Sequence, residues 1–259
     1  MSKDRFQLIL SNLHLVDNDE DQGTDRLYKV RPFISMVKSS FQVYEPEEEL
    51  SFDEGTCPFK GRVRVRVYNP MKPNKFGIKV YQISEARSGY CVGFDVYDGS
   101  EGCTSYVEAL DLDPEELSTT TKVVVGLLSS CGLLQKGHKV YMDNYNNSPE
   151  LFEELELLQT YAAGTVRINR KGMPRVFGVV KNLKPGEVIF RRRGNLLAVK
   201  YHDKRDVHVI STFHRATMYV QEHLNRNRDV VRKPTVISDY CKLLVVLILQ
   251  IKLHNIMRF

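Results

Sequence analysis

Two acidic residues stand at the ends of short apolar segments, where carboxylates often form ligand sites. Asp53 follows residues 50–52, whose period-two alternation predicts a strand with the carboxylate at its end. Asp143 ends the apolar run 139–142 and precedes residues 148–149, a Ser-Pro pair typical of a helix cap and first turn. A strand, an aspartate and a capped helix often frame a ligand site in mixed α/β sheets. Taken alone, Asp143 could equally close an Asx turn.

The segment after Asp53 is strongly basic, since residues 60–84 carry seven basic and no acidic side chains. Arginine and valine alternate through residues 62–68, which predicts a strand with one apolar and one cationic face. A turn is expected at residues 72–75, followed by a second strand at 77–83. The simpler interpretation of this block alone is a solvated hairpin whose charges protect an exposed edge. The alternative is a surface for a polyanion.

Charge is segregated along the chain, although the net charge is only +5. Residues 1–59 carry 6 basic and 12 acidic groups, and residues 85–159 carry 4 and 14. By contrast, residues 60–84 carry +7, and residues 160–234 carry 17 basic and 5 acidic groups. Two basic surfaces on an acidic body are typical of proteins that grip a nucleic-acid backbone, while the alternative is simply solvated faces.

Length and composition fit one substantial core, with room for a small insertion, in 259 residues that are 42% hydrophobic. The five cysteines have no zinc-type spacing, and their odd number argues against a disulfide framework. We therefore expect a reducing compartment and no structural metal. The charged start of the chain does not resemble a signal peptide, and the longest apolar run, 243–249, is too short to span a bilayer.

Hydrophobic periodicity supplies the remaining elements. Helices are expected at 5–15 and 29–44, and a third strand at 89–97 completes an antiparallel meander. A helix capped by Ser118 or Thr119 is expected to reach Leu134. The next helix should bury one face, formed by Leu151, Phe152, Leu155 and Leu158. Short strands are predicted at 186–190, 196–201 and 207–211, and His208 and His214 are interpreted as solvent or core histidines.

Several motifs together resemble the catalytic domain of piggyBac transposases. The first group surrounds the basic hairpin: Ser51-Phe52-Asp53-Glu54, Phe59-Lys60-Gly61-Arg62, Lys72-Pro73, Lys75, Gly77, Lys79, Gly89-Tyr90 and Tyr97-x-Gly99. The second group follows Asp143: Met142-Asp143-Asn144-Tyr145, Ser148-Pro149-Glu150-Leu151 and Gly164-Thr165-Val166-Arg167-x-Asn169-Arg170-Lys171-Gly172-x-Pro174. Because the order and spacing are kept over residues 5–240, the resemblance is specific.

The resemblance implies an α/β fold, an RNase H-like mixed sheet with flanking helices and a β-rich insertion, preceded by a short helical segment. DDE-type transposases use three acidic residues to hold two divalent ions that cleave and join DNA phosphodiesters. Asp53 and Asp143 match the first two of these residues, so both are implied as catalytic residues and as Mg²⁺ ligands. Carboxylate and phosphate oxygens suit the octahedral shell of this hard cation. We expect both aspartates to lie side by side on adjacent central strands.

The same resemblance predicts a DNA-binding surface that contacts phosphates without reading bases. Its members are Arg62, Arg64, Arg66, Lys72, Lys75, Arg167, Arg170 and Lys171. Expected domains are a remnant of a helical dimerisation and DNA-binding region at 1–48, the RNase H-like catalytic core at 49–169, the β-rich insertion at 170–232, and an aberrant tail at 233–259.

The tail departs from the family pattern at the point where the third aspartate should lie. Residues 234–240 lead toward this motif, but residues 241–259 contain no acidic side chain. A coding sequence for the family segment Gly-Val-Asp-Ile-Ala-Asp-Gln, read one nucleotide later, gives the segment 246–252 found here. We therefore predict a frameshift between Lys242 and Val246, real or introduced by gene modelling, and a poorly ordered or opportunistically docked run at 243–259.

These observations predict a transposase-derived protein that is related to enzymes of DNA cleavage and strand transfer. We expect it to be catalytically inactive, that is, a pseudoenzyme. The alternative is a domesticated, non-enzymatic module that binds DNA or protein. Expected partners are DNA and a second copy in a homodimer, with no membrane and no small-molecule substrate. The expected location is nuclear.

Overall fold

A computed structural model describes residues 1–72, 74–99, 110, 117–224 and 230–243. The helices are α1 (Lys3–Ser11), α2 (Arg31–Phe41), α4 (Thr119–Ser130), α5 (Pro149–Leu157) and α6 (Val176–Val179), with single 3-10 turns η1 (Asn18–Glu20) and η2 (Tyr28–Val30). The strands are β1 (Glu49–Pro58), β2 (Arg66–Tyr68), β3 (Phe76–Glu85), β4 (Cys91–Val96), β5 (Lys139–Met142), β6 (Tyr161–Thr165), β7 (Val188–Arg193), β8 (Leu196–His202), β9 (Asp206–Ser211), β10 (Met218–Leu224) and β11 (Val230–Pro234). A further helix occupies residues 235–243.

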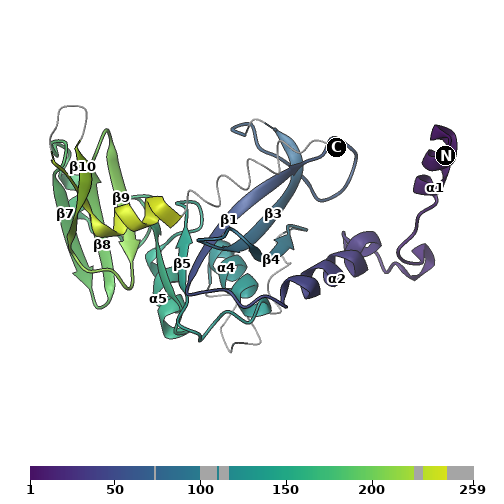
Figure 1. The fold of residues 1–259 in the computed structure, drawn as a ribbon, viewed down its shortest axis with the longest axis horizontal. Coiled ribbons are helices and arrows are strands. Elements are labelled where there is room, and N and C mark those ends of the chain that lie inside the picture. The colour runs from purple at the N-terminus through teal and green to yellow at the C-terminus, as the bar shows by residue number, and fades with distance from the viewer. Residues whose placement is uncertain (73, 100–109, 111–116, 225–229, 244–259) are drawn as a thin grey trace.

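The central sheet has the strand order β4-β3-β1-β5-β6. Its first three strands are antiparallel, while β1-β5 and β5-β6 are parallel pairs. The connections from β4 to β5 and from β5 to β6 pass through α4 and α5. This topology is that of an RNase H-like sheet, so the expected fold class is confirmed. Figure 1 shows both helices beside the sheet.

One face of this sheet is buried under α4 and α5. Ser118 caps α4 by accepting a hydrogen bond from the Thr121 amide, and Ser148 caps α5 in the same way at the Leu151 amide. The predicted inner residues Leu151, Phe152 and Leu155 are fully buried, and Leu158 packs against their cluster. Removing a buried aromatic ring from such a core typically costs about 3–5 kcal/mol, so the packing of α4 and α5 on this face stabilises the sheet.

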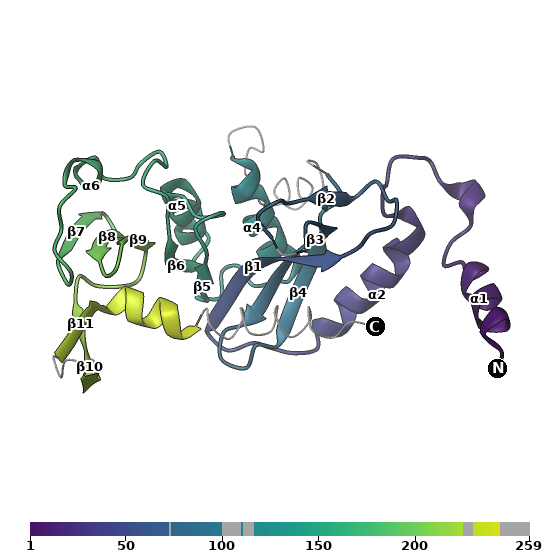
Figure 2. The ribbon, with the colours of Figure 1, turned by 90° about the horizontal axis from the view of Figure 1, so that it is seen from above.

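The opposite face carries a second core cluster, because side chains alternate along each strand. Tyr141 of β5 and Ala163 of β6 join residues of β8 and β9 in this cluster. Val236 and Ile237 of the 235–243 helix pack into it. Figure 2 shows this helix, in yellow, between β11 and the central sheet. Residues from the far end of the chain thereby reach the strands that carry Asp53 and Asp143.

The predicted β-rich segment is hydrogen-bonded to the central sheet. β9 pairs antiparallel with β6 through Ala163 and Ser211, and β8 and β7 extend the sheet further. β10 and β11 form a separate two-stranded sheet. Within the chain as the structure describes it, no helix is long and apolar enough to cross a membrane.

The N-terminal helix α1 lies away from the sheet, as Figures 1 and 2 show. Helix α1 buries none of its residues and exposes apolar side chains such as Phe6 and Ile9. Helix α2 begins with a proline in its first turn, as expected, and contacts β4. Lys38 of α2 forms an ion pair of 2.8 Å with Asp95 of β4, which helps to hold this helix on the sheet.

Two strand predictions were wrong. Only Arg66–Tyr68 of the alternating segment 62–68 forms a strand, because β3 is paired with β1 on one edge and offers the other edge to β2 over three residues only. Val63 is consequently 42% exposed instead of facing a core. In addition, β1 does not end at Asp53 but continues to Pro58, since β3 remains paired with it beyond the end of β5.

Candidate functional site

Asp53 and Asp143 follow two residues that pair across parallel strands. Phe52 of β1 lies opposite Met142 of β5, and this is the last pair in the register. Adjacent strands are about 4.8 Å apart, so the two aspartates occupy neighbouring positions at the end of this pairing. The charge of Asp143 raises the pKa of Asp53, as expected for two nearby carboxylates.

Asp53 is a perturbed carboxyl group. Burial raises its pKa to about 6, and the charges of Asp143 and Glu54 act in the same direction. A hydrogen bond of 2.7 Å from the Glu54 amide to Asp53 Oδ1 and the nearby Lys72 ammonium oppose this shift. A nearby cation stabilises the ionised form of a buried carboxylate. The surroundings of Asp53 therefore favour binding of a cation.

Glu54 faces the opposite side of the sheet from Asp53. Along β1, Asp53 is paired with Gln82 and Glu54 with Tyr81, and neighbouring positions on a strand alternate between faces. Burial also raises the pKa of Glu54, whereas Lys79 lowers it. The side chains of Asp53 and Glu54 therefore leave β1 on opposite faces, although the charge of Asp143 raises the pKa of both.

Asp143 closes an Asx turn, as one of the two interpretations of the sequence proposed. Its Oδ1 accepts a hydrogen bond of 2.9 Å from the Tyr145 amide. Carboxylates have two oxygens and several lone pairs, so the turn leaves acceptor capacity for a ligand. The turn and the ligand-site interpretation are thus compatible.

Asn147 and Gly164 fix the end of the strand that carries Asp143. Asn147 Nδ2 donates to the carbonyl of Met142 at 2.9 Å and to that of Thr165 at 2.7 Å, which ties β5 to β6. A Cβ at Gly164 would lie 2.1 Å from the Met142 carbonyl oxygen and 2.2 Å from Asn147 Nδ2. Only glycine permits this close approach without displacing the strand end.

A chain of contacts joins both basic segments to the turn after Asp143. Lys79 Nζ lies 3.8 Å from Glu54 Oε2 and 4.6 Å from the centre of the Tyr145 ring. From the other segment, Arg170 donates a hydrogen bond of 2.7 Å to the Tyr145 carbonyl. Lys72 donates to the Glu54 carbonyl at 3.3 Å. Basic residues distant in sequence therefore meet around residues 143–145.

The predicted basic residues fall into two groups. Arg62, Arg64, Lys75, Arg167 and Lys171 have exposed side chains and are available to a ligand. Three others have partners in the protein: Lys72 and Arg170, as above, and Arg66, which donates to the carbonyls of Lys60 and Gly61 and stacks on Phe76. These three also brace the loops around the site.

Tyr240 of the 235–243 helix lies within electrostatic range of the two aspartates. Its hydroxyl lies 3.2 Å from Thr165 Oγ1. Burial raises the pKa of Tyr240 to about 12, and the charges of Asp143 and Asp53 contribute to this shift. In the same helix, Asp239 lies 3.5 Å from His214 Nε2 and 3.9 Å from Lys242 Nζ. The helix thus enters the site with a neutral hydroxyl, while residues 244–259, including the predicted frameshifted run, lie outside the described residues.

Asp53 and Asp143 offer hard oxygen ligands of the type that Mg²⁺ prefers. Within the described ranges, no three His, Cys, Asp or Glu side chains are close enough together to hold a metal ion. Mg²⁺ is often bound by one or two carboxylates, with water and substrate phosphate completing its shell. The donor chemistry of this pair therefore fits one such ion.

The sequence did not predict three residues that position the site. Lys79 belongs to a recognised motif but was not placed in the predicted basic surface. Asn147 gives no local signal, since its two acceptors lie in different strands. Tyr240 was recognised only as part of the approach to the third aspartate. The Asx turn at Asp143, by contrast, was one of the two interpretations that the local sequence offered.

An RNase H-like sheet with aspartates after paired positions of β1 and β5 is an arrangement found in DDE-type transposase domains. A family model described as Transposase IS4 matches residues 1–244. Human PiggyBac transposable element-derived protein 2 is 30% identical over 217 residues, which cover 81% of this chain and 35% of that protein. Human PiggyBac transposable element-derived protein 3 is 31% identical over 170 residues, covering 64% and 27%.

The fold is also that of a solved structure, a cryo-EM structure of a piggyBac transposase synaptic complex with hairpin DNA. The TM-score is 0.83 at 22% identity, over 99% of this chain and 51% of that one. The chain belongs to the piggyBac transposase family. It spans about a third of the first human relative and about half of the solved transposase chain.

Proposed function

We propose that this chain is a transposase-derived DNA-binding domain that grips the phosphate backbone around Asp53 and Asp143 and does not cleave it. The observation that carries the proposal is the meeting of two basic segments at one turn. Lys79 contacts the ring of Tyr145, and Arg170 contacts its carbonyl. The exposed Arg167 and Lys171 flank Arg170 in sequence. Cations around an acidic pair suit a phosphate group that shares a divalent ion with the carboxylates.

Asp53 and Asp143 would hold Mg²⁺ together with phosphate and water oxygens. When bound, this ion polarises a phosphodiester and lowers the pKa of its water. The chain itself contributes two carboxylates and the neutral hydroxyl of Tyr240 to this region. Two-ion chemistry in this family uses a third acidic residue, and residues 241–259 contain none. Loss of one of three carboxylates supports binding without cleavage.

A second candidate function, docking of another protein, is favoured by the apolar side chains of α1. Phe6, Leu8 and Leu10 are each more than half exposed. Contiguous exposed apolar side chains are typical of protein interaction sites. The homodimer expected from the sequence would be one such complex, which sedimentation of the full chain tests directly.

Binding to duplex DNA at several salt concentrations tests the main proposal. The test variant neutralises Arg62, Arg64 and Lys75, and the matched control neutralises the equally exposed Lys3, Lys29 and Lys136. Each lost phosphate contact should reduce the slope of log affinity against log salt by about 0.9. The test variant should therefore lose affinity for all sequences and flatten the slope, while the control keeps both. Equal behaviour of the two variants would show that this surface only keeps the chain in solution.

Incubation of the same DNA with Mg²⁺ or Mn²⁺ tests the absence of cleavage. We expect intact DNA from the parent chain. Metal-dependent cuts that disappear in Asp53→Asn and Asp143→Asn would contradict this part of the proposal and assign catalysis to the pair. Binding to nuclear DNA would further require a nuclear location, which imaging of the tagged chain measures.

A further inference from the structure

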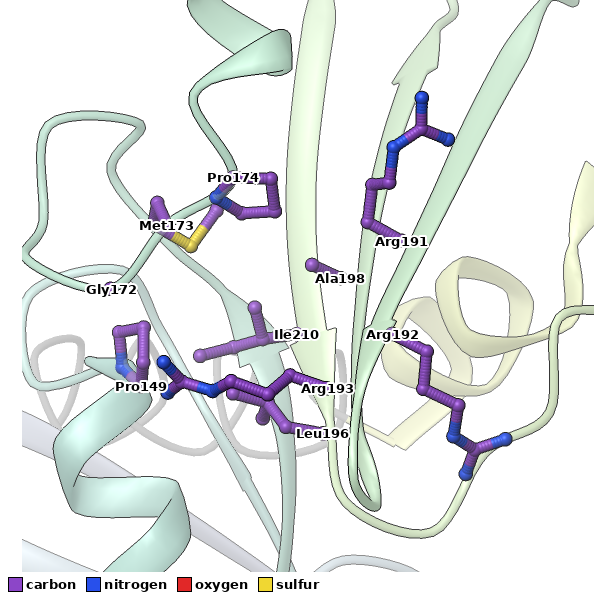
Figure 3. Close-up of a pocket in the computed structure, with 10 residues that line it drawn as sticks. All are labelled: Pro149, Gly172, Met173, Pro174, Arg191, Arg192, Arg193, Leu196, Ala198 and Ile210. Carbon is purple, nitrogen blue, oxygen red and sulfur yellow. The ribbon is translucent and has the colours of Figure 1, made fainter.

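A pocket of about 270 Å³ lies between the loop after Arg170 and the strands of the β-rich segment. One wall is formed by Gly172, Met173 and Pro174 together with Pro149, the first residue of α5. The floor is apolar and comes from β8 and β9, through Leu196, Ala198 and Ile210. Figure 3 shows these residues around the hollow.

The rim of the pocket is cationic. Arg191, Arg192 and Arg193 are consecutive residues of β7 and border the pocket. Figure 3 shows the side chain of Arg193 extending toward Pro149, while that of Arg192 extends away from Pro149 and Met173. Arg193 is paired with Glu153 of α5, whereas Arg191 and Arg192 donate to backbone carbonyls and form no ion pair among the described residues. An apolar floor with a positive rim suits a flat apolar group that carries a negative charge.

Two walls of the pocket are formed by segments that follow residues of the candidate site along the chain. Its 172–174 wall follows Arg170, whose guanidinium donates to the Tyr145 carbonyl. Its other wall begins at Pro149, only a few residues after Asp143. Gly172 has φ +87, and a Cβ there would lie 3.1 Å from Pro149 Cβ, so glycine allows the two walls to meet. The segments that lead out of the candidate site after Asp143 and Arg170 therefore form two walls of this pocket.

We infer that the pocket binds one unpaired nucleobase of DNA, with its phosphate at Arg191. A base supplies a flat apolar group for the floor of the pocket, and its phosphate supplies a negative charge for the cationic rim. The pocket volume suits a single nucleotide better than a folded peptide element. A base stacked in a duplex cannot enter, so the pocket selects DNA with an unpaired base near the bound phosphate. Proline, methionine and arginine side chains supply the flat apolar and cationic surfaces on which extruded bases are held. The inference rests on the proposed DNA binding.

The test compares a fully paired duplex with one of the same length that contains a single unpaired fluorescent purine analogue. We expect the parent chain to bind the second DNA about tenfold more tightly and to change the fluorescence of the analogue, because stacking on a protein surface favours an unpaired base. Ala198→Leu, which fills the floor, and Arg191→Gln should remove this preference. The matched control, Arg205→Gln, should retain it, because this exposed arginine does not line the pocket.

The outcomes separate this inference from the proposed function. Equal binding of the paired and unpaired DNA by the parent chain overturns the pocket assignment and leaves DNA binding intact, whereas no binding of either DNA overturns both. If Ala198→Leu does not fold, Arg191→Gln decides, because its side chain is exposed. Displacement of the analogue by N-acetyltyrosine amide, but not by a mononucleotide, would assign the pocket to a protein side chain instead and overturn the inference.

Discussion

Phe52 of β1 lies directly opposite Met142 of β5 in a parallel pair, and the next residue of each strand is an aspartate. Both aspartates thereby fall on the face that the 235–243 helix covers, where Tyr240 lies close enough for their charges to raise its pKa. A register slip by one residue would move Asp53 to the other face. The site therefore depends on the strand pairing as much as on the two carboxylates.

Gly164→Ala should destabilise the fold by about 1–3 kcal/mol, because the added methyl overpacks against a backbone carbonyl and Asn147. The displacement acts on the end of β5, so divalent-ion binding at Asp143 should weaken as well. Urea denaturation measures the free energy of unfolding. The matched control is Gly178→Ala in α6, where a Cβ meets nothing within 4 Å. Equal effects of the two substitutions would contradict the close approach at Gly164.

Lys200→Met should cost about 3 kcal/mol of stability. The Lys200 side chain is only 3% exposed and pairs with Asp206 at 2.8 Å. It also donates to the carbonyls of Phe177 and Val180 at 2.9 and 2.6 Å, which anchors the end of α6 to β8. Removing the ammonium leaves these acceptors without their donor. Lys181→Met, at an exposed position, is the control, and thermal melting that shifts equally in both variants would refute the anchoring role.

The lowered pKa of His208 should make the free energy of unfolding fall as the pH drops below about 6.5. Burial and the neighbouring Lys200 lower the pKa of His208, while Asp206 raises it. The folded state favours the neutral ring. The stability that the neutral ring contributes is therefore present above the pKa of the unfolded state and is lost as the pH falls through the pKa of the folded state. His208→Gln should therefore lessen the fall in melting temperature between about pH 7 and pH 5. Substitution of the exposed His14 by glutamine should leave the fall in melting temperature unchanged. Identical pH profiles for the parent chain and His208→Gln would disprove the effect.

Sequencing of genomic DNA and transcript should reveal an acidic family-type segment in the neighbouring frame after Lys242. The expectation rests on residues 246–252, which a one-nucleotide shift of the family segment can encode. Restoring that frame should supply the third aspartate and yield Mg²⁺-dependent DNA cleavage. A neighbouring frame without such a segment would exclude the frameshift, and a restored chain that remains inactive would require another cause of inactivity.

Local patterns in the sequence determined the elements that carry the site. The apolar run before Asp143 predicted β5, and the Ser-Pro pair at 148–149 predicted the start of α5. Both features depend on interactions within a few residues, namely side-chain alternation and capping, so the sequence displays them directly. The family motifs added the RNase H-like order of the strands, which the parallel pairing of β1 with β5 confirmed.

Only the tertiary structure decided which residues share the site, because pairing between distant strands has no local signal. β3 holds β1 extended past Asp53, and so places Glu54 on the opposite face. The same edge pairing reduces the alternating segment 62–68 to three strand residues. Lys79 and Arg170 meet at Tyr145 through contacts between chain segments far apart in sequence. The sequence therefore predicted the two carboxylates, whereas the side chains that surround them are placed by long-range packing.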